Sequence, residues 1–77
     1  MKIEYTEYAE MKIAKRELSK TQIENVLKNP DKILEGKYGR KIAQKIVEGC
    51  LMRVIFEEQG NVYKVITVYY SKPERYA

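Results

Sequence analysis

The strongest constraint on the fold of this chain is a two-residue turn, Gly60-Asn61, between two segments rich in β-branched and aromatic residues. A turn of this composition is typical of a β-hairpin, so segments 51–57 and 62–70 are predicted to be its strands. Pairing across the turn places Gln59 opposite Val62, which sets the register of the whole hairpin. The second half of the chain is therefore predicted to form an antiparallel sheet.

The hairpin register also predicts which side chains share a face of the sheet. One face is apolar and aromatic and is predicted to pack against helices: Met52, Val54, Phe56, Tyr63, Val65, Thr67 and Tyr69. The other face is predicted to be more solvated and carries Arg53, Ile55, Glu57, Lys64, Ile66 and Val68. Glu57 lies opposite Lys64 in this pairing, and such a cross-strand pair of opposite charges supports the register.

The first part of the chain predicts a short strand followed by a helix. Residues 2–5 alternate between polar and apolar side chains, which indicates a strand. Thr6 is then placed to cap a helix that ends near Arg16. Its apolar residues recur at helical spacing, and Tyr8 is expected on the buried side.

A second helix and a third strand are predicted in the middle of the chain. Ser19 begins a capping box, which is a signature of a helix N-terminus. This helix ends at Asn29-Pro30, because proline biases the preceding residue away from helical angles. From Arg40 onward the period changes to about two, so 41–47 is predicted to be a strand that Gly49 ends.

Composition limits the domain organisation and excludes several classes of protein. A chain of 77 residues has room for one small core, so 1–77 is expected to be a single domain. No apolar run approaches the roughly 18 residues of a membrane span, and no signal peptide begins the chain, so the protein is expected in the cytoplasm. With one cysteine, Cys50, and no histidine, no zinc site or cofactor site is expected. The net charge of +4, concentrated in the C-terminal half, favours a polyanionic partner.

Short segments along nearly the whole chain resemble the RelE/ParE toxin superfamily, most closely a small uncharacterised RelE-like family. The resemblance lies in their order and spacing: Tyr8-Ala9, Lys12-Ile13, 16–19, 29–31, 53–58, 65–69 and Arg75-Tyr76. It implies an α+β fold with a short N-terminal strand and two helices packed on one face of a 3-4 stranded antiparallel sheet. The chain departs from the small family where Tyr8 replaces its usual histidine and Lys12 its arginine.

The resemblance implies the toxin of a type II toxin-antitoxin pair. RelE-type toxins cut messenger RNA in the ribosomal A site by driving a ribose 2′-hydroxyl onto the neighbouring phosphate, and they use lysines, arginines and a tyrosine. A histidine-free site is compatible with this chemistry, which needs cations near the phosphate and a group that moves protons. The implied partners are RNA or the ribosome and a cognate antitoxin. The alternative is a non-catalytic ParE-like or degenerate module that binds nucleic acid or protein, and the residues leave open whether the chain is an enzyme.

The catalytic residues implied by the resemblance are Arg53, Lys41, Lys45, Arg75 and Tyr76. Arg53 aligns with the strand arginine of RelE, and a guanidinium on a solvated face suits phosphate binding. Lys41 and Lys45 are predicted to share a face of their strand. The alternatives are an Arg53 paired to a carboxylate, lysines that only guard a sheet edge, and a tail that frays.

Four more residues are predicted to contact nucleic acid: Arg40, Lys64, Tyr70 and Lys72. Three supply positive charge in the basic half of the chain, and a tyrosine offers a flat ring for base stacking. The apolar residues Ile55, Ile66 and Val68 on the Arg53 face are predicted to bind an antitoxin segment, or alternatively to be buried in a homodimer.

Overall fold

The computed structural model describes residues 2–75 as two helices, a mixed sheet and a terminal 3-10 turn. The elements are β1 (Lys2–Tyr5), α1 (Glu7–Lys15), α2 (Lys20–Lys28), β2 (Lys32–Glu35), β3 (Lys41–Val47), β4 (Cys50–Gln59), β5 (Val62–Ser71) and η1 (Pro73–Arg75). None of the helices in this range is long and apolar enough to cross a membrane.

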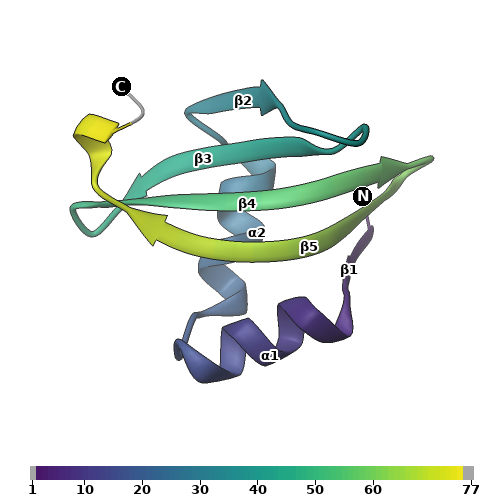
Figure 1. Cartoon of the computed structure of the whole chain (residues 1–77), viewed down its shortest axis with the longest axis horizontal. Helices are drawn as coiled ribbons and strands as arrows, with labels where there is room; N and C mark the ends of the chain where they lie inside the picture. Colours follow the sequence, from purple (N-terminus) through teal and green to yellow (C-terminus); the bar gives the residue numbers. More distant parts are fainter. Residues whose placement is uncertain (1, 76–77) are drawn as a thin grey trace.

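The sheet has five strands in the order β1-β5-β4-β3-β2 (Figure 1). Neighbours are antiparallel except at one edge, where β1 runs parallel to β5 and pairs Lys2 with Val62 and Tyr5 with Val65. The prediction of an α+β fold is confirmed, but the prediction of a 3-4 stranded antiparallel sheet is wrong. The sheet gains β2 at one edge, and β1 joins at the other edge in the parallel direction.

Both helices begin at the predicted capping residues. The Thr6 hydroxyl accepts a hydrogen bond from the Ala9 N–H at 3.0 Å, and the Ser19 hydroxyl accepts one from the Gln22 N–H at 3.3 Å. Each cap satisfies a backbone donor that has no partner within the helix. The prediction for Tyr8 is wrong: its side chain is 51% exposed, and the Lys12 ammonium lies 5.3 Å from its ring centroid.

The core lies between the helices and one face of the sheet, with α2 behind the strands in Figure 1. Its members come from both helices and from the three central strands: Ala9, Ile13, Ile23, Val26, Leu27, Ala43, Met52, Val54, Phe56, Val65 and Val68. Phe56 and Tyr63 stack with their ring centroids 4.8 Å apart. The predicted packing of two helices on the Met52 face is confirmed.

The β4–β5 hairpin has the predicted register near its turn. Gln59 pairs with Val62 and Glu57 with Lys64. Gly60 has a φ of 62°, a left-handed angle that glycine adopts without steric cost.

A β-bulge changes the register farther from the turn. Phe56 pairs with Val65 but Ile55 pairs with Thr67, so Ile66 is an extra residue without a partner on β4. One extra residue reverses the faces of all that follow it. The predicted faces of the last part of β5 are therefore wrong: Val68 lies in the core at 0% exposure, whereas Thr67 and Tyr69 lie on the opposite face.

Past the four residues that pair with β1, one edge of β5 has no neighbouring strand among the described residues. Two of its backbone carbonyl groups accept hydrogen bonds from side chains instead. The Thr6 hydroxyl donates to the Ile66 carbonyl at 3.2 Å, and the Arg16 guanidinium donates to the Val68 carbonyl at 2.8 Å. A capped edge is a poor template for pairing with another chain. Arg16, a residue of the toxin resemblance, therefore has a structural role here.

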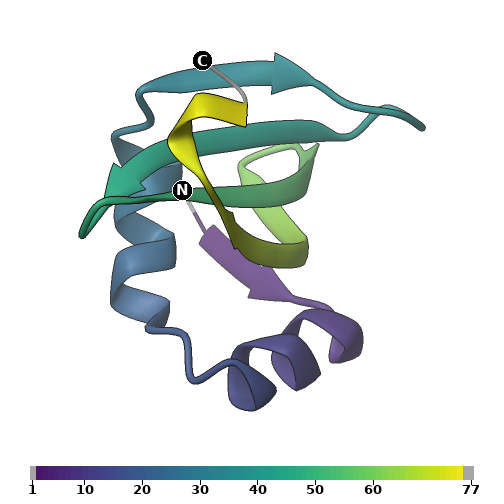
Figure 2. The same ribbon diagram turned by 60° about the vertical axis from the view of Figure 1, so that its left-hand side comes forward.

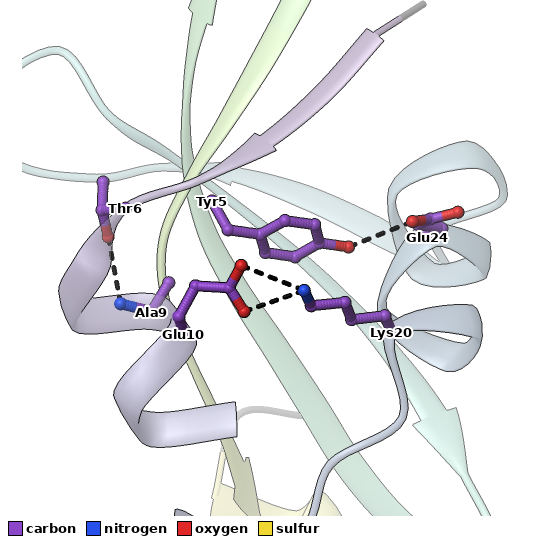
Figure 3. A network of polar contacts seen from close by, with 6 residues as sticks. All are labelled: Tyr5, Thr6, Ala9, Glu10, Lys20 and Glu24. Carbon is purple, nitrogen blue, oxygen red and sulfur yellow. Dashed lines mark hydrogen bonds and ion pairs between the residues drawn. The ribbon is translucent and has the colours of Figure 1, made fainter. Parts of the chain in front are cut away.

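A small polar network joins β1 to both helices (Figure 3). The Tyr5 hydroxyl donates to Glu24 on α2 at 3.2 Å, and the Lys20 ammonium contacts Glu10 on α1 at 2.8 Å. The same ammonium lies 4.7 Å from the Tyr5 ring centroid. Tyr5 therefore connects the edge strand to the start of α2.

This network predicts a loss of stability at alkaline pH. Burial, and then the charge and hydrogen bond of Glu24, raise the pKa of Tyr5 well above its ordinary 10.0. A raised folded-state pKa contributes stability that is complete below pH 10 and is lost as the pH rises further. Above pH 10 the unfolding free energy of wild type should decrease as the pH rises, and that of Tyr5→Phe should decrease less. Urea unfolding at a series of pH values measures both. Tyr38→Phe, at an exposed position, is the control, and its unfolding free energy should change with pH as that of wild type does. The same pH dependence for Tyr5→Phe and Tyr38→Phe would contradict the prediction.

Candidate nucleic-acid interface

The sheet has one face that neither helix covers, called here the helix-free face. Its side chains alternate along the strands with the core residues, so they point away from the helices. The central ones are Ile42, Gln44, Arg53, Ile55, Thr67 and Tyr69. Figure 2 shows η1 beyond the strand ends, on the side of the sheet away from α2.

Arg53 lies in the middle of the helix-free face, in a row across three strands. It is directly opposite Gln44 on β3 and Tyr69 on β5. Its Nε donates to the Gln44 side-chain oxygen at 3.2 Å, and its Nη1 donates to the Tyr69 hydroxyl at 2.6 Å. The guanidinium carbon is 5.6 Å from the Tyr69 ring centroid. The row holds the guanidinium plane in a defined orientation.

Arg53 is only 6% exposed, so the predicted solvated position is wrong. The bulge is one cause, because it places the large Tyr69 side chain beside Arg53 where the predicted register had Val68. The alternative was an Arg53 paired to a carboxylate, and Glu57, the first carboxylate after it on β4, instead contacts Arg40 at 3.5 Å. Gln44 and Tyr69 belong to the site, but neither was predicted.

Gln44 and Tyr69 are neutral hydrogen-bond acceptors that orient the guanidinium of Arg53. A planar guanidinium with several N–H donors matches the oxygens of a phosphate or carboxylate. A tyrosine hydroxyl at 2.6 Å adds a group that both accepts and donates a proton. The row is thus suited to binding an anion and to moving a proton beside it.

Lys41 and Lys45 share a face of β3, as predicted, but it is the face opposite Arg53. They pair across the strand with Phe56 and Met52 of the core face. Lys41 contacts Glu58 at 3.4 Å, and Lys45 contacts Asp31 at 3.3 Å.

The Asp31 carboxylate accepts a backbone hydrogen bond in addition to its ion pair with Lys45. The Ile46 N–H donates to it at 3.0 Å, and this bond, followed by Lys45, lowers the pKa of the Asp31 carboxyl. Lys45 is therefore one of two groups that bind this carboxylate, which lies directly before the start of β2. The structure does not bring Lys41 and Lys45 together with Arg53.

Arg40 and Lys64 lie at one end of the helix-free face, on either side of Glu57. Arg40 Nε is 3.5 Å from the Glu57 carboxylate, and Lys64 pairs with Glu57 across β4 and β5. Two cations thus flank one carboxylate. Both residues were predicted to contact nucleic acid, and the structure places them on the same face as Arg53.

The remaining predicted residues lie near the end of β5. Tyr70 is on the helix side, where its hydroxyl donates to the Gln22 side chain at 3.3 Å. Lys72 is exposed and lines an open cavity of about 570 Å³ between the β3–β4 turn and η1. Burial in this region raises the pKa of the Tyr70 phenol, and the charge of Glu48 adds to the rise. Arg75 is the last residue of η1, and Tyr76 lies outside the described residues.

Within residues 2–75 no three His, Cys, Asp or Glu side chains gather as ligands for a metal ion. The polar groups of the helix-free face include Arg53, Gln44 and Tyr69 and the cations around Glu57. These groups come from β3, β4, β5 and the loop before β3, so the fold of the sheet assembles them.

Comparison with known proteins identifies one family. The family described as a domain of unknown function, DUF4258, matches residues 5–70. Neither the curated proteins nor the solved structures yield a match to the chain. The matched region runs from the last residue of β1 almost to the end of β5, so it includes both helices and the whole helix-free face. This chain therefore belongs to the DUF4258 family.

Proposed function

We propose that this chain is a RelE-like toxin that binds RNA on its helix-free face, with Arg53 as the residue that holds a phosphate. The observation that carries the proposal is the row of Gln44, Arg53 and Tyr69 across the three central strands. Gln44 and Tyr69 orient the Arg53 guanidinium on the face of the sheet that the helices do not cover. A planar guanidinium held in this way matches the oxygens of a phosphate.

The low exposure of Arg53 determines how a phosphate reaches it. A phosphate oxygen contacts the guanidinium by replacing the Tyr69 hydroxyl or the Gln44 oxygen as acceptor. A phosphate accepts two parallel N–H bonds from a guanidinium and adds an attraction between opposite charges that neither neutral acceptor provides, so the exchange is favourable. It needs only a rotation of side chains, since Tyr69 and Gln44 lie on strands fixed by the ladder.

Charge around Arg53 supports a polyanionic ligand. Arg40 and Lys64 flank Glu57 at one end of the face, and the chain as a whole carries a net charge of +4. Each phosphate that a protein cation contacts releases condensed counterions from the nucleic acid, which favours binding at low salt. A single strand that crosses the face has a phosphate site at Arg53 and further cations beside Glu57.

Cleavage of the bound RNA is the enzymatic form of this proposal. A ribose 2′-hydroxyl attacks the neighbouring phosphorus, the bond to the 5′-oxygen breaks, and the products are a cyclic phosphate and a 5′-hydroxyl. Arg53 stabilises the charge that builds on the phosphate, and the Tyr69 hydroxyl accepts the proton of the 2′-hydroxyl while it gives its own proton to the departing 5′-oxygen. The site is therefore centred on Arg53 and Tyr69.

A second candidate is a non-catalytic module with the same binding face, as in the ParE-like alternative. One observation favours it: Lys41 and Lys45, the lysines that the toxin resemblance implies for catalysis, lie on the other face of the sheet and are ion-paired. An RNA-binding face without these lysines has fewer groups to stabilise a transition state. This candidate binds RNA and leaves it intact.

The proposal predicts that Arg53→Ala weakens RNA binding and lowers its salt dependence. We expect the dissociation constant for a short single-stranded RNA to rise about 10- to 150-fold, the range for losing hydrogen bonds to a charged group. The slope of log affinity against log salt should fall by about 0.7 for one lost phosphate contact. Fluorescence anisotropy across a salt series measures both quantities. Lys41→Ala removes one cation from the other face and is the matched control.

Two further readouts separate the candidates. Arg53→Lys keeps the charge without the paired donors, so it should bind RNA with intermediate affinity. Incubation of wild type with translating ribosomes, followed by mapping of RNA ends, distinguishes a nuclease from a binding module. Equal losses for Arg53→Ala and Lys41→Ala would show that binding does not depend on the helix-free face.

A further inference from the structure

The loop between β2 and β3 carries the most exposed of the large hydrophobic side chains in residues 2–75. Tyr38 is 89% exposed and has a φ of 60°. A left-handed φ is unusual for a bulky residue, and such positions concentrate at functional sites. An aromatic ring held in water by a strained backbone is available to bind a ligand.

The loop is closed by backbone hydrogen bonds, so the position of Tyr38 is defined. The Gly36 N–H donates to the Arg40 carbonyl at 2.8 Å, and the Arg40 N–H donates to the Lys37 carbonyl at 3.1 Å. Gly39 has a φ of 73° and completes the turn. The ring is thus presented on a short fixed loop, with Lys37 beside it in sequence and Arg40 two residues away.

Next to this loop is a cavity of about 190 Å³, called here the loop hollow. It is lined by Gly36, Lys37, Tyr38, Arg40, Ile42 and Ile55. Ile42 and Ile55 face each other across β3 and β4 on the helix-free face, so the hollow lies on the same face as Arg53. Its lining combines two isoleucines of the sheet with one aromatic and two cationic residues of the loop. The volume is several times the ~30 Å³ that one water molecule occupies in the liquid.

We infer that the loop hollow binds one unstacked base of single-stranded RNA, with Tyr38 stacked on the base and Lys37 and Arg40 beside the flanking phosphates. The inference rests on the proposed function and adds the class of strand to it. Stacking on an aromatic ring is available to every base, and cations beside the ring follow the backbone. A duplex buries its base faces, so a protruding tyrosine selects single strands.

The position of the hollow agrees with a strand that also contacts Arg53. Ile55 of the hollow is two residues from Arg53 on β4, and Ile42 is two residues from Gln44 on β3. Residues two apart on a strand point to the same face and lie roughly 7 Å apart. This spacing is close to the distance between neighbouring phosphates of an extended strand, so one strand reaches both sites.

The test compares Tyr38→Ala with Tyr38→Phe in binding to a short single-stranded RNA and to the same RNA as a duplex, by fluorescence anisotropy. Tyr38→Ala should weaken single-strand binding about 5- to 150-fold, the range for losing one base stack, with an unchanged salt slope. Tyr38→Phe keeps the ring and should bind as wild type. Tyr8→Ala removes another exposed tyrosine, from α1, and should change nothing.

Different failures point to different conclusions. Wild type that binds neither RNA would overturn the proposed function and this inference together. Single-strand binding that Arg53→Ala weakens and Tyr38→Ala does not would overturn the inference alone. Equal affinity of wild type for the single strand and the duplex would also overturn it. Because Tyr38 is almost fully exposed, its variants should keep the wild-type melting temperature, which circular dichroism checks.

Discussion

Val68→Asp is expected to unfold the domain, whereas Thr67→Asp is expected to leave it folded. Val68 is 0% exposed in the core, and Thr67 lies on the helix-free face opposite Ile55. An unpaired buried carboxylate costs several kcal/mol, a large part of the roughly 5–15 kcal/mol that stabilises a typical domain. Circular dichroism melting of the two variants measures the difference.

This pair of variants tests the β-bulge directly. Without the bulge at Ile66, Thr67 would lie in the core and Val68 on the helix-free face, and the two results would be exchanged. A folded Val68→Asp beside an unfolded Thr67→Asp would therefore show that the ladder continues without the extra residue. Thr67→Val, which adds no charge, is the control for substitution at this site.

Phe56→Ala is expected to lower the unfolding free energy by about 3–5 kcal/mol, the typical cost of removing a buried aromatic ring. Phe56 is 1% exposed and stacks against Tyr63 at the point where the bulge begins. In a domain of this size each kcal/mol moves the melting temperature by roughly 4–8 °C. The variant should therefore melt at least about 12 °C below wild type, as scanning calorimetry or circular dichroism would show.

Two control variants show whether the loss of stability comes from the buried ring of Phe56. Phe56→Leu keeps most of the buried volume and should lose clearly less stability. Ile33→Ala shortens an exposed apolar side chain on β2 and should change stability by about 0.5 kcal/mol or less. A loss for Phe56→Ala no larger than that for Ile33→Ala would mean that the stacked pair is not part of the core.

Local signals in the sequence predicted the elements well. Thr6 and Ser19 accept the capping bonds expected of them, and the Gly60-Asn61 turn sets Gln59 opposite Val62. Such signals act over a few residues, so the sequence alone is enough to read them. Helix starts, the hairpin and the face that carries Met52 were predictable for this reason.

The bulge was not predictable, because nothing in the residues around Ile66 marks it. The strand is uniformly rich in β-branched and aromatic residues, and the alternation of its faces does not distinguish one register from the other. A single extra residue exchanged the faces of Val68 and Tyr69. The site therefore differs from the predicted one, because Tyr69 and not Val68 lies beside Arg53.

The separation of the lysines from Arg53 did have a signal in the sequence. Glu48 and Gly49 both have positive φ, of 51° and 81°, and form a second two-residue turn that pairs Val47 with Cys50. Counting back from this turn places Lys45 opposite Met52, on the core face, and Gln44 opposite Arg53. Gly49 therefore indicates a hairpin turn, which sets a register, as well as the end of a strand.

The two outer strands could not be placed from local patterns. β2 is four residues long, and β1 pairs with a strand at the far end of the chain. Short edge strands carry little periodicity, and parallel pairing needs a long connection whose path depends on the rest of the fold. Their positions follow from tertiary packing, with Tyr5 and Lys20 tying β1 to the helices.

The parallel pairing of β1 with β5 has a consequence for synthesis on the ribosome. Lys2 pairs with Val62, so β1 leaves the exit tunnel long before its partner strand exists. At usual translation rates the delay is on the order of 3–12 s. During that time Ile3 and Tyr5 lack the strand beside which they pack, and the nascent chain exposes apolar side chains and an unpaired strand edge. The domain is therefore completed only when the last hairpin has been translated, and chaperones can bind β1 before then.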